Sequence, residues 1–271
     1  MLKGAVALAA GMVTVALGLG GCTGTSSAVA GLEPTDVATP TLTESPTPSP
    51  TPSPTPSATP PPSPSTTKTT PRPPTTTKSS PNWTYAPSGG PTAGSGTVWR
   101  YRIAVEAGVP VTIGDFTTVV NSTLDDPKSW IAGGIQFQQV GSGDSAQFTV
   151  WLASPSTAYS MCINGGIDIR VGGVPYTSCR VGNNVVLNSS RYLNAVSGYP
   201  LDPYRQYMVN HEVGHRLGHG HELCPGAGLP APVMEQQTLG RHGCVANAWP
   251  YVDGRAYHGR SGAYDDPIPR S

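Results

Sequence analysis

Apolar residues occur in two separate regions of this chain, with a long polar stretch between them. An apolar run, Ala5–Leu19, follows the early charge of Lys3, and Val, Ile, Trp and Tyr return in number only from about residue 97. The 271 residues therefore divide into segments 1–21, 22–96 and 97–271. The last segment is long enough to bury a single hydrophobic core, so one folded domain is expected.

The periodicity within the last segment predicts both strands and helices. Alternating or continuous apolar runs of strand length cover residues 98–105, 135–140, 148–152 and 185–187. Apolar positions 113, 116, 120 and 124 share one helical face, which Asp125, Asp126 and Pro127 terminate. A glycine-rich hairpin is expected near residues 165–173. The predicted fold class is α+β.

A second helix is predicted from Asp202 to about Leu217. Asp202 has a side chain suited to the N-cap, and Pro203 suits the first helical position because it has a fixed φ and no amide proton. Gly218 can adopt the left-handed conformation that ends helices.

The first segment resembles an export signal. Its apolar run is shorter than a membrane span, and Leu19-Gly20-Gly21-Cys22 resembles a bacterial lipobox, which predicts lipidation of Cys22. Ala28-Val29-Ala30 offers a competing cleavage site that would release a secreted protein after Ala30. An uncleaved membrane anchor is a third alternative. The first two readings place the protein outside the cytoplasm.

Composition separates the middle segment from the domain. Residues 23–96 are mostly Pro, Thr and Ser, and they have too few apolar side chains to offset the entropy of ordering. We therefore expect a disordered stalk between the membrane and the domain. The formal net charge is zero, which argues against nucleic-acid binding. We expect the protein to be a monomer.

Four cysteines remain in segment 97–271: Cys162, Cys179, Cys224 and Cys244. Disulfides are the default in an exported chain, and four cysteines allow three pairings. We favour Cys162 with Cys179 and Cys224 with Cys244, because each bridge closes a short local loop.

The second helix contains the residues that indicate chemistry. His211 and His215 are four positions apart, so both imidazoles project from one helical face, a spacing that suits a single Zn²⁺ ion. Glu212 points about 100° away, where its carboxylate can act as general base toward a water molecule. These residue types at this spacing predict a hydrolytic zinc site.

A third ligand must come from beyond the helix. A chain that turns sharply at Gly218 can bring His221 back to the metal, whereas His219 would share the helical face only if the helix continued. We favour His221 over His219. Glu222 is too close to the end of the helix to serve as a ligand.

The pattern His211-Glu212-x-x-His215-x-x-Gly218-x-x-His221 matches the zinc-binding motif of metzincin peptidases, and this part of the chain resembles that clan. The resemblance implies that Met234, within Ala231-Pro232-Val233-Met234, forms the methionine turn beneath the zinc. It also implies a zincin-like fold, a twisted mixed sheet whose edge strand borders the cleft and binds extended peptides. Residues 148–152 are the candidate edge strand.

The wider domain is similar to an actinobacterial exported family that is known only as a domain of unknown function. This similarity includes Tyr207-Met208-Val209-Asn210 before the zinc motif and Cys224-Pro225-Gly226 after it.

One position departs from the metzincin pattern. Several metzincins have an oxyanion-stabilising tyrosine two residues after the turn methionine, and here that position is Gln236. Gln236, His242 or Tyr251 could donate instead, or zinc alone could polarise the carbonyl. The expected function is zinc-dependent hydrolysis of proteins or peptides at the cell envelope. The alternatives are a non-enzymatic, zinc-stabilised binding domain and a metal-scavenging surface lipoprotein.

Overall fold

A computed structural model describes residues 81–90 and 92–265 of the chain. The expected signal segment, Cys22, Ala30 and most of the expected stalk therefore lie outside the described residues. Folded structure begins before residue 97, the boundary that composition predicted, because two short strands lie between residues 83 and 94. Within the described part, no helix is both long and apolar enough to cross a membrane.

The described residues form short strands and a few helices. The strands are β1 (Trp83–Tyr85), β2 (Ala93–Gly94), β3 (Thr97–Glu106), β4 (Ile135–Gln139), β5 (Phe148–Ala153), β6 (Arg170–Val171), β7 (Val174–Pro175), β8 (Cys179–Val181), β9 (Asn184–Asn188), β10 (Tyr251–Val252) and β11 (Arg255–Ala256). The helices are α1 (Ile113–Leu124), α2 (Pro155–Asn164), α3 (Ser189–Leu193) and α4 (Leu201–Leu217), with a 3₁₀ turn, η1 (Trp130–Gly133).

The main sheet is mixed, in the order β2-β4-β3-β5-β9-β8, and β1 pairs with β3 off this path. Pairs β3–β4, β3–β5 and β5–β9 are parallel, whereas β2–β4, β1–β3 and β8–β9 are antiparallel. A mixed sheet with few helices confirms the α+β class. The expected hairpin is the β6–β7 pair, whose strands flank Gly172 and Gly173.

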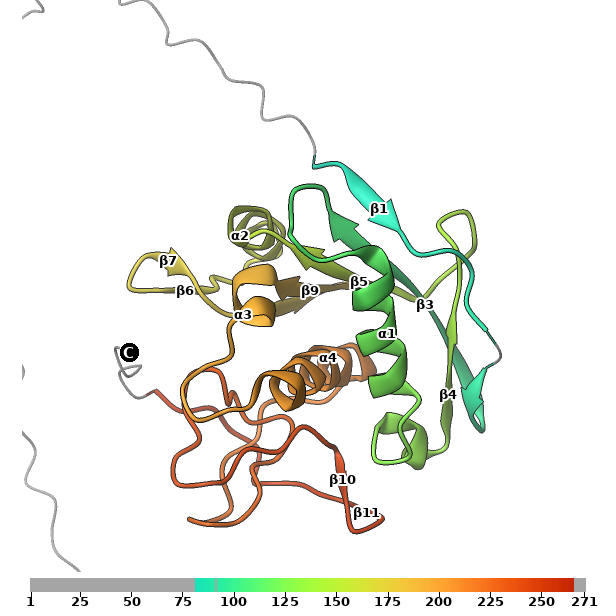
Figure 1. Cartoon of the computed structure of the whole chain (residues 1–271). Helices are drawn as coiled ribbons and strands as arrows, with labels where there is room; N and C mark the ends of the chain where they lie inside the picture. Colours follow the sequence, from blue (N-terminus) through green and yellow to red (C-terminus); the bar gives the residue numbers. More distant parts are fainter. Residues whose placement is uncertain (1–80, 91, 266–271) are drawn as a thin grey trace, which may run out of the picture. The chain divides into compact units, whose positions relative to one another are not determined.

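Helices cover both faces of the sheet, and Figure 1 shows α2 on one face with α1, α3 and α4 on the other. The residues of β5 alternate between these faces: Val150 and Leu152 join the larger core with α1 and α4, whereas Ala153 joins the core beneath α2. Because strand side chains alternate, one buried strand contributes to two cores.

The expectation that residues 148–152 form an edge strand was wrong. β5, which contains them, lies between β3 and β9, so both of its backbone edges are paired. Its nearly continuous burial is typical of a central parallel strand. The strands at the two ends of this order are β2 and β8, and β8 pairs with β9 alone.

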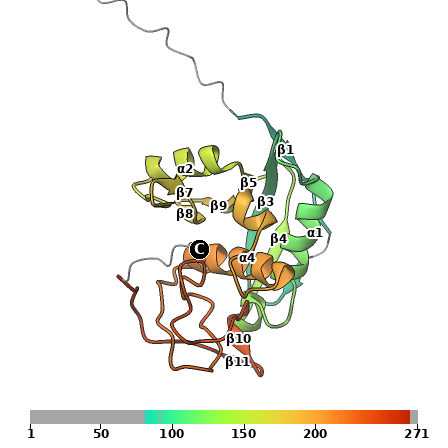
Figure 2. The same cartoon turned by 60° about the vertical axis from the view of Figure 1, so that its left-hand side comes forward.

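Helix α4 lies between the sheet and the C-terminal loops. Every residue from Tyr207 to Gly214 is buried, because the sheet covers one side of the helix and the loops cover the other (Figure 2). The sequence predicted Asp202 as the N-cap of α4, but the N-cap is Pro200. Asp202 lies inside the first turn, where it forms an ion pair with Arg205 at 3.0 Å.

The helix ends where the sequence predicted. Gly218 is the C-cap, with a φ of 103° that an L side chain rarely adopts. The amide of His219 donates to the carbonyl of Gly214 at 3.0 Å, a bond typical of a glycine-terminated helix.

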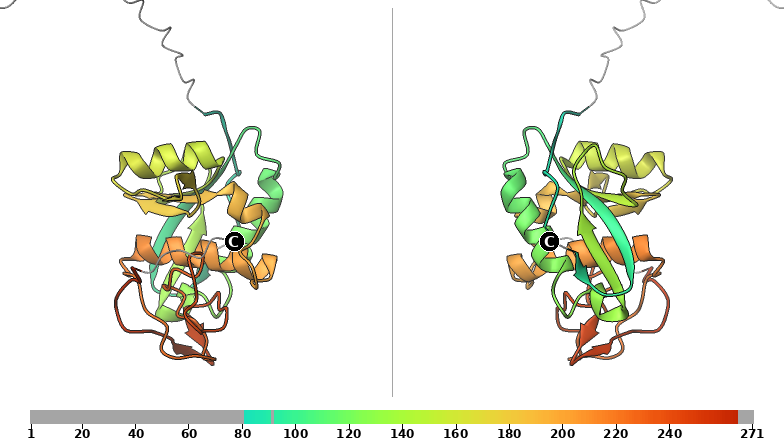
Figure 3. Two further views of the ribbon diagram at one scale, coloured as in Figure 1. Left: turned by 90° about the vertical axis from the view of Figure 1, so that its left-hand side faces the viewer. Right: turned by 90° about the vertical axis from the view of Figure 1, so that its right-hand side faces the viewer.

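The chain after α4 has little regular structure. Apart from the β10–β11 pair, residues 218–265 form loops, which lie on the side of α4 that faces away from the sheet (Figure 3). The disulfide Cys224–Cys244 lies within this region, and Cys162–Cys179 joins α2 to β8. These are the two pairings that loop length favoured.

Candidate metal centre

Three histidines meet where α4 ends and the C-terminal loops begin. His211 and His215 project from successive turns of α4, and the turn at Gly218 returns the chain so that His221 faces them. The potential ligand atoms of the three residues all lie within 4.8 Å of one another. The Nε2 atoms of His215 and His221 are 3.1 Å apart.

Backbone carbonyls orient two of the three imidazoles. The Nδ1 atom of His211 lies 2.8 Å from the carbonyl oxygen of Val233, and Nδ1 of His215 lies 2.9 Å from that of His219. A carbonyl accepts, so Nδ1 carries the proton and Nε2 is left as a lone-pair donor. Metal-binding histidines in proteins are commonly held in this way.

The surroundings favour the neutral form of all three imidazoles. Burial lowers the pKa of His211 well below its usual value, and the neighbouring His215 lowers it further. Burial also lowers the pKa of His215, and it lowers that of His221 to about 4. A neutral imidazole is the form that binds a metal ion.

Glu212 is the carboxylate nearest to this cluster in sequence, and it is buried. Within the part of the chain that the structure describes, its Oε2 atom has no hydrogen-bond partner. Burial raises the pKa of Glu212 to about 8, although the positive charge of Arg180 opposes the shift. An unpartnered buried oxygen is costly unless a ligand satisfies it. Three converging neutral imidazoles, in a pocket that such an oxygen also lines, fit a divalent metal ion with an attached water molecule.

The floor of the site is the turn that contains Met234. The amide of Glu235 donates to the carbonyl of Pro232 at 2.9 Å, and the amide of Glu222 donates to the carbonyl of Met234 at 3.1 Å. Met234 is buried. The same short turn therefore holds His211, through Val233, and the segment that begins at His221.

Close packing joins this turn to α4. A Cβ atom on Gly214 would lie only 2.5 Å from Sδ of Met234 and 2.6 Å from Cζ2 of Trp130. Only glycine allows this approach between the helix, the turn and the indole ring.

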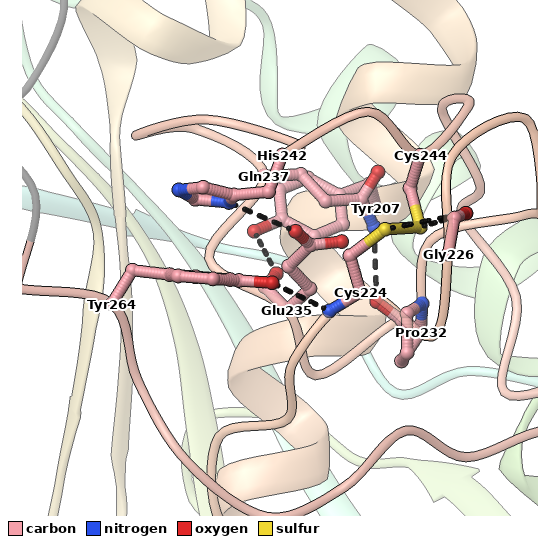
Figure 4. Close-up of polar contacts among 9 residues, drawn as sticks. All are labelled: Tyr207, Cys224, Gly226, Pro232, Glu235, Gln237, His242, Cys244 and Tyr264. Atoms are coloured by element: carbon pink, nitrogen blue, oxygen red, sulfur yellow. Dashed lines mark hydrogen bonds and ion pairs between the residues drawn. A yellow bond between two sulfur atoms is a disulfide. The ribbon is translucent and has the colours of Figure 1, made fainter.

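Further polar contacts fix the turn beneath α4 (Figure 4). Tyr207, on α4, donates its hydroxyl to the carbonyl of Glu235 at 2.9 Å, and Gln237 donates to the carbonyl of Pro232 at 3.2 Å. The buried carboxylate of Glu235 lies 3.2 Å from Nδ1 of His242. The Cys224–Cys244 disulfide lies close by and ties the same loop region together.

A pocket of about 360 Å³ opens onto the histidines. Helix α4 and residues Gln236, Thr238 and Leu239 form one wall, and segments 167–171 and 177–180 form the other. The second wall includes two residues of β8, so the free edge of the sheet borders the pocket. A cleft beside an unpaired strand edge can accept an extended peptide.

The structure separates the predicted site residues into two groups. His211, Glu212, His215, His221 and Gln236 all line the pocket, and Met234 lies beneath it. The remaining candidates are His219, Glu222, His242 and Tyr251.

Each remaining candidate lies elsewhere. His219 stacks on Trp130 with ring centroids 4.4 Å apart, and Glu222 lies 3.0 Å from Nδ1 of His258. His242 stacks on Tyr264. Tyr251 lines a second pocket, together with His219.

Sequence reasoning missed two residues that shape the centre. Asn210 is fully buried and donates to the carbonyl of Ala248 at 2.9 Å, while its own carbonyls accept from Ser129 and Trp130. It thereby joins α4 to η1 and to the C-terminal loops. Arg180, on β8, places a positive charge in the pocket. Asn210 is one of many polar residues of α4 in the sequence, so nothing singled out its role, and nothing local indicated Arg180.

The fold and the site thus define a disulfide-containing α+β domain with a group of three histidines able to hold a metal ion. The chain belongs to DUF3152, a family of proteins of unknown function, whose family model matches residues 69–244. The match includes the three histidines and both disulfides. Comparison with curated proteins and with solved structures gives no match. The disulfides indicate an extracytoplasmic location.

Proposed function

We propose that this protein is a zinc metallopeptidase of the metzincin type, with a zincin-like fold, that hydrolyses proteins or peptides at the cell envelope. One observation carries the proposal: three histidine nitrogens converge in a pocket that is also lined by Glu212, whose buried carboxylate oxygen has no hydrogen-bond partner among the described residues, and that is bordered by an edge strand. A structural zinc ion normally has four protein ligands. Only three converge among the described residues.

His211, His215 and His221 would hold one Zn²⁺ ion. When bound, such an ion lowers the pKa of a coordinated water to about 7 and polarises the peptide carbonyl. The protein supplies the rest of the chemistry. Glu212 accepts the proton of the attacking water as the oxygen bonds to the carbonyl carbon, and then donates that proton to the nitrogen of the leaving amine as the C–N bond breaks.

Gln236 is the proposed donor to the carbonyl oxygen. Of the three alternatives to the metzincin tyrosine it alone lines the pocket with the histidines, whereas Tyr251 lines a different pocket. A side-chain amide can stabilise developing negative charge on oxygen by hydrogen bonding.

The test compares the full chain with a Glu212→Gln variant, which keeps the size of the side chain but removes the base. Metal content is measured by elemental analysis, and cleavage is measured on casein and a peptide library. We expect about one zinc ion per chain in both proteins, with cleavage at least ~100-fold slower in the variant. Equal zinc with no cleavage by either protein would indicate the zinc-stabilised binding domain instead.

We further propose that Cys22 is the lipid-modified residue that anchors the protein to the membrane. The chain has five cysteines, and the other four form the two disulfides, so no cysteine partner within the chain is left for Cys22. Labelling with a radioactive fatty acid should mark the wild-type protein and not a Cys22→Ala variant. Release of unlabelled protein that begins after Ala30 would overturn this proposal.

A further inference from the structure

Arg180 is a charged residue that the proposed hydrolysis does not use. It lies on β8, the strand at the free edge of the sheet, and it lines the pocket with Glu212 and His215. Its neighbours Cys179 and Val181 both pack into the core beneath α2. Because strand side chains alternate, the side chain of Arg180 projects to the opposite face, where α4 packs against β8.

The guanidinium of Arg180 has no partner. No hydrogen bond or ion pair joins it to another residue in the described ranges, and its Nε atom is buried. It nevertheless lies within electrostatic reach of the site, because its charge lowers the pKa of both Glu212 and His215. A buried donor without a partner is unfavourable unless a bound ligand provides one.

Of the two described arginines that line the pocket, Arg180 is the one without an ion-pair partner. Arg170 also lines the pocket, but it forms an ion pair with Asp168 at 2.7 Å and lies over the ring of Tyr159. The planar fork of a guanidinium matches the two oxygens of a carboxylate. An extended peptide beside β8 would bring its own groups past this position.

We propose that Arg180 binds a carboxylate of the peptide substrate, either the C-terminal carboxylate or an acidic side chain close to the scissile bond. This inference rests on the peptidase activity proposed above. The first source would make the protein an enzyme that removes residues from the C-terminus, and the second would make it an endopeptidase with a preference for acidic sites.

Matched peptide pairs test the inference and distinguish the two sources. One pair differs in a free or amidated C-terminus, and the other has Glu or Gln beside the cleaved bond. We expect the full-length protein to prefer the carboxylate-bearing member of one pair by about 10–100-fold in kcat/KM. The Arg180→Gln variant should lose that preference, because it should cleave the carboxylate-bearing peptide more slowly than the wild type does and the other peptide at the same rate.

Two further variants separate recognition from a structural role. Arg180→Glu should favour peptides with Lys at the recognised position, a gain that a damaged fold would not produce. Arg170→Gln should keep the preference for a carboxylate. The inference is overturned if Arg180→Gln retains the preference or if Arg170→Gln abolishes it.

A binding measurement keeps the inference independent of turnover. Glu212→Gln, which should bind peptides without cleaving them, is titrated with an acidic peptide mixture and with the same mixture carrying neutral amides in place of its carboxylates. Tighter binding of the acidic mixture should disappear in the Glu212→Gln/Arg180→Gln double variant. Absence of cleavage by the wild type contradicts the peptidase, whereas equal binding of both mixtures contradicts the role of Arg180.

Discussion

Replacing Gly214 by alanine tests whether the methionine turn and α4 are packed as closely as described. The new Cβ atom would lie 2.5 Å from Sδ of Met234 and 2.6 Å from Cζ2 of Trp130. Carbon atoms in contact are normally about 3.5–4.0 Å apart, so each neighbour must withdraw by roughly 1 Å. Trp130 is poorly placed to move, because its Nε1 donates to the carbonyl of Asn210 at 3.0 Å and its ring stacks on His219.

Two opposing effects determine the change in the free energy of unfolding. Alanine is more favourable than glycine inside a helix by about 1 kcal/mol, whereas overpacking a filled core costs about 1–3 kcal/mol. The methionine side chain can absorb part of the overlap, but the indole ring cannot. We therefore expect Gly214→Ala to lower stability by as much as about 2 kcal/mol.

The chain provides a matched control on another helix. Gly114 lies in α1, is exposed, and would place a Cβ atom no closer than 3.8 Å to its nearest neighbour. Gly114→Ala should raise stability by about 0.5–1 kcal/mol. The two variants should thus differ by about 0.5–3 kcal/mol, which is about 1–12 °C in Tm for a domain of this size.

Thermal unfolding followed by circular dichroism, with a chelator present to exclude stabilisation by bound metal, measures both variants. A second measurement is zinc affinity, which Gly214→Ala should weaken, because a displaced Trp130 disturbs His219, whose backbone carbonyl accepts a hydrogen bond from Nδ1 of His215. If Gly214→Ala is as stabilising as Gly114→Ala, the described packing beneath the histidines is wrong.

Three other predictions concern the residues around the centre. Replacing Cys224 and Cys244 by serine opens a loop with a sequence separation of 20 and should lower stability by about 3 kcal/mol in urea unfolding; an unchanged midpoint would refute this. Burial raises the pKa of Glu235 to about 7, so the folded state binds more protons than the unfolded state between pH 4.5 and 7. Glu235 should therefore lower the stability of the metal-free protein as pH rises through that window, and the stability of the wild type relative to Glu235→Gln should fall by as much as about 3 kcal/mol. Finally, His221→Ala should lose zinc in equilibrium dialysis while His219→Ala retains it, and the reverse result would make His219 the third ligand.

Features that depend on neighbouring residues in the sequence were predicted well. The positions of His211 and His215 on one helical face follow from the helical period, and the turn at Gly218 follows from the conformational freedom of glycine. Helix α1 occupies the range that its apolar spacing predicted. The predicted start of α4 was wrong. Asp202 has a side chain suited to an N-cap, but it is the second residue of the helix.

Features that depend on strand order could not be predicted. The apolar run of β5 was visible, but its place at the centre of the sheet is set by pairing with β3 and β9, which lie far away in the sequence. The same non-local pairing makes β8 the edge strand and brings Arg180 to the histidines. Helix α2 was missed because only Ala158 and Cys162 of its residues are buried, too few to produce a helical pattern.

The irregular chain after α4 has a consequence for when the site can form. It supplies His221 and the turn of Met234, yet it has little regular hydrogen bonding to order it and is crosslinked by Cys224–Cys244. In a reducing cytoplasm that crosslink would be absent. The loop region that completes the group of three histidines should therefore be less stable in newly made chains than in chains that have been oxidised outside the cytoplasm.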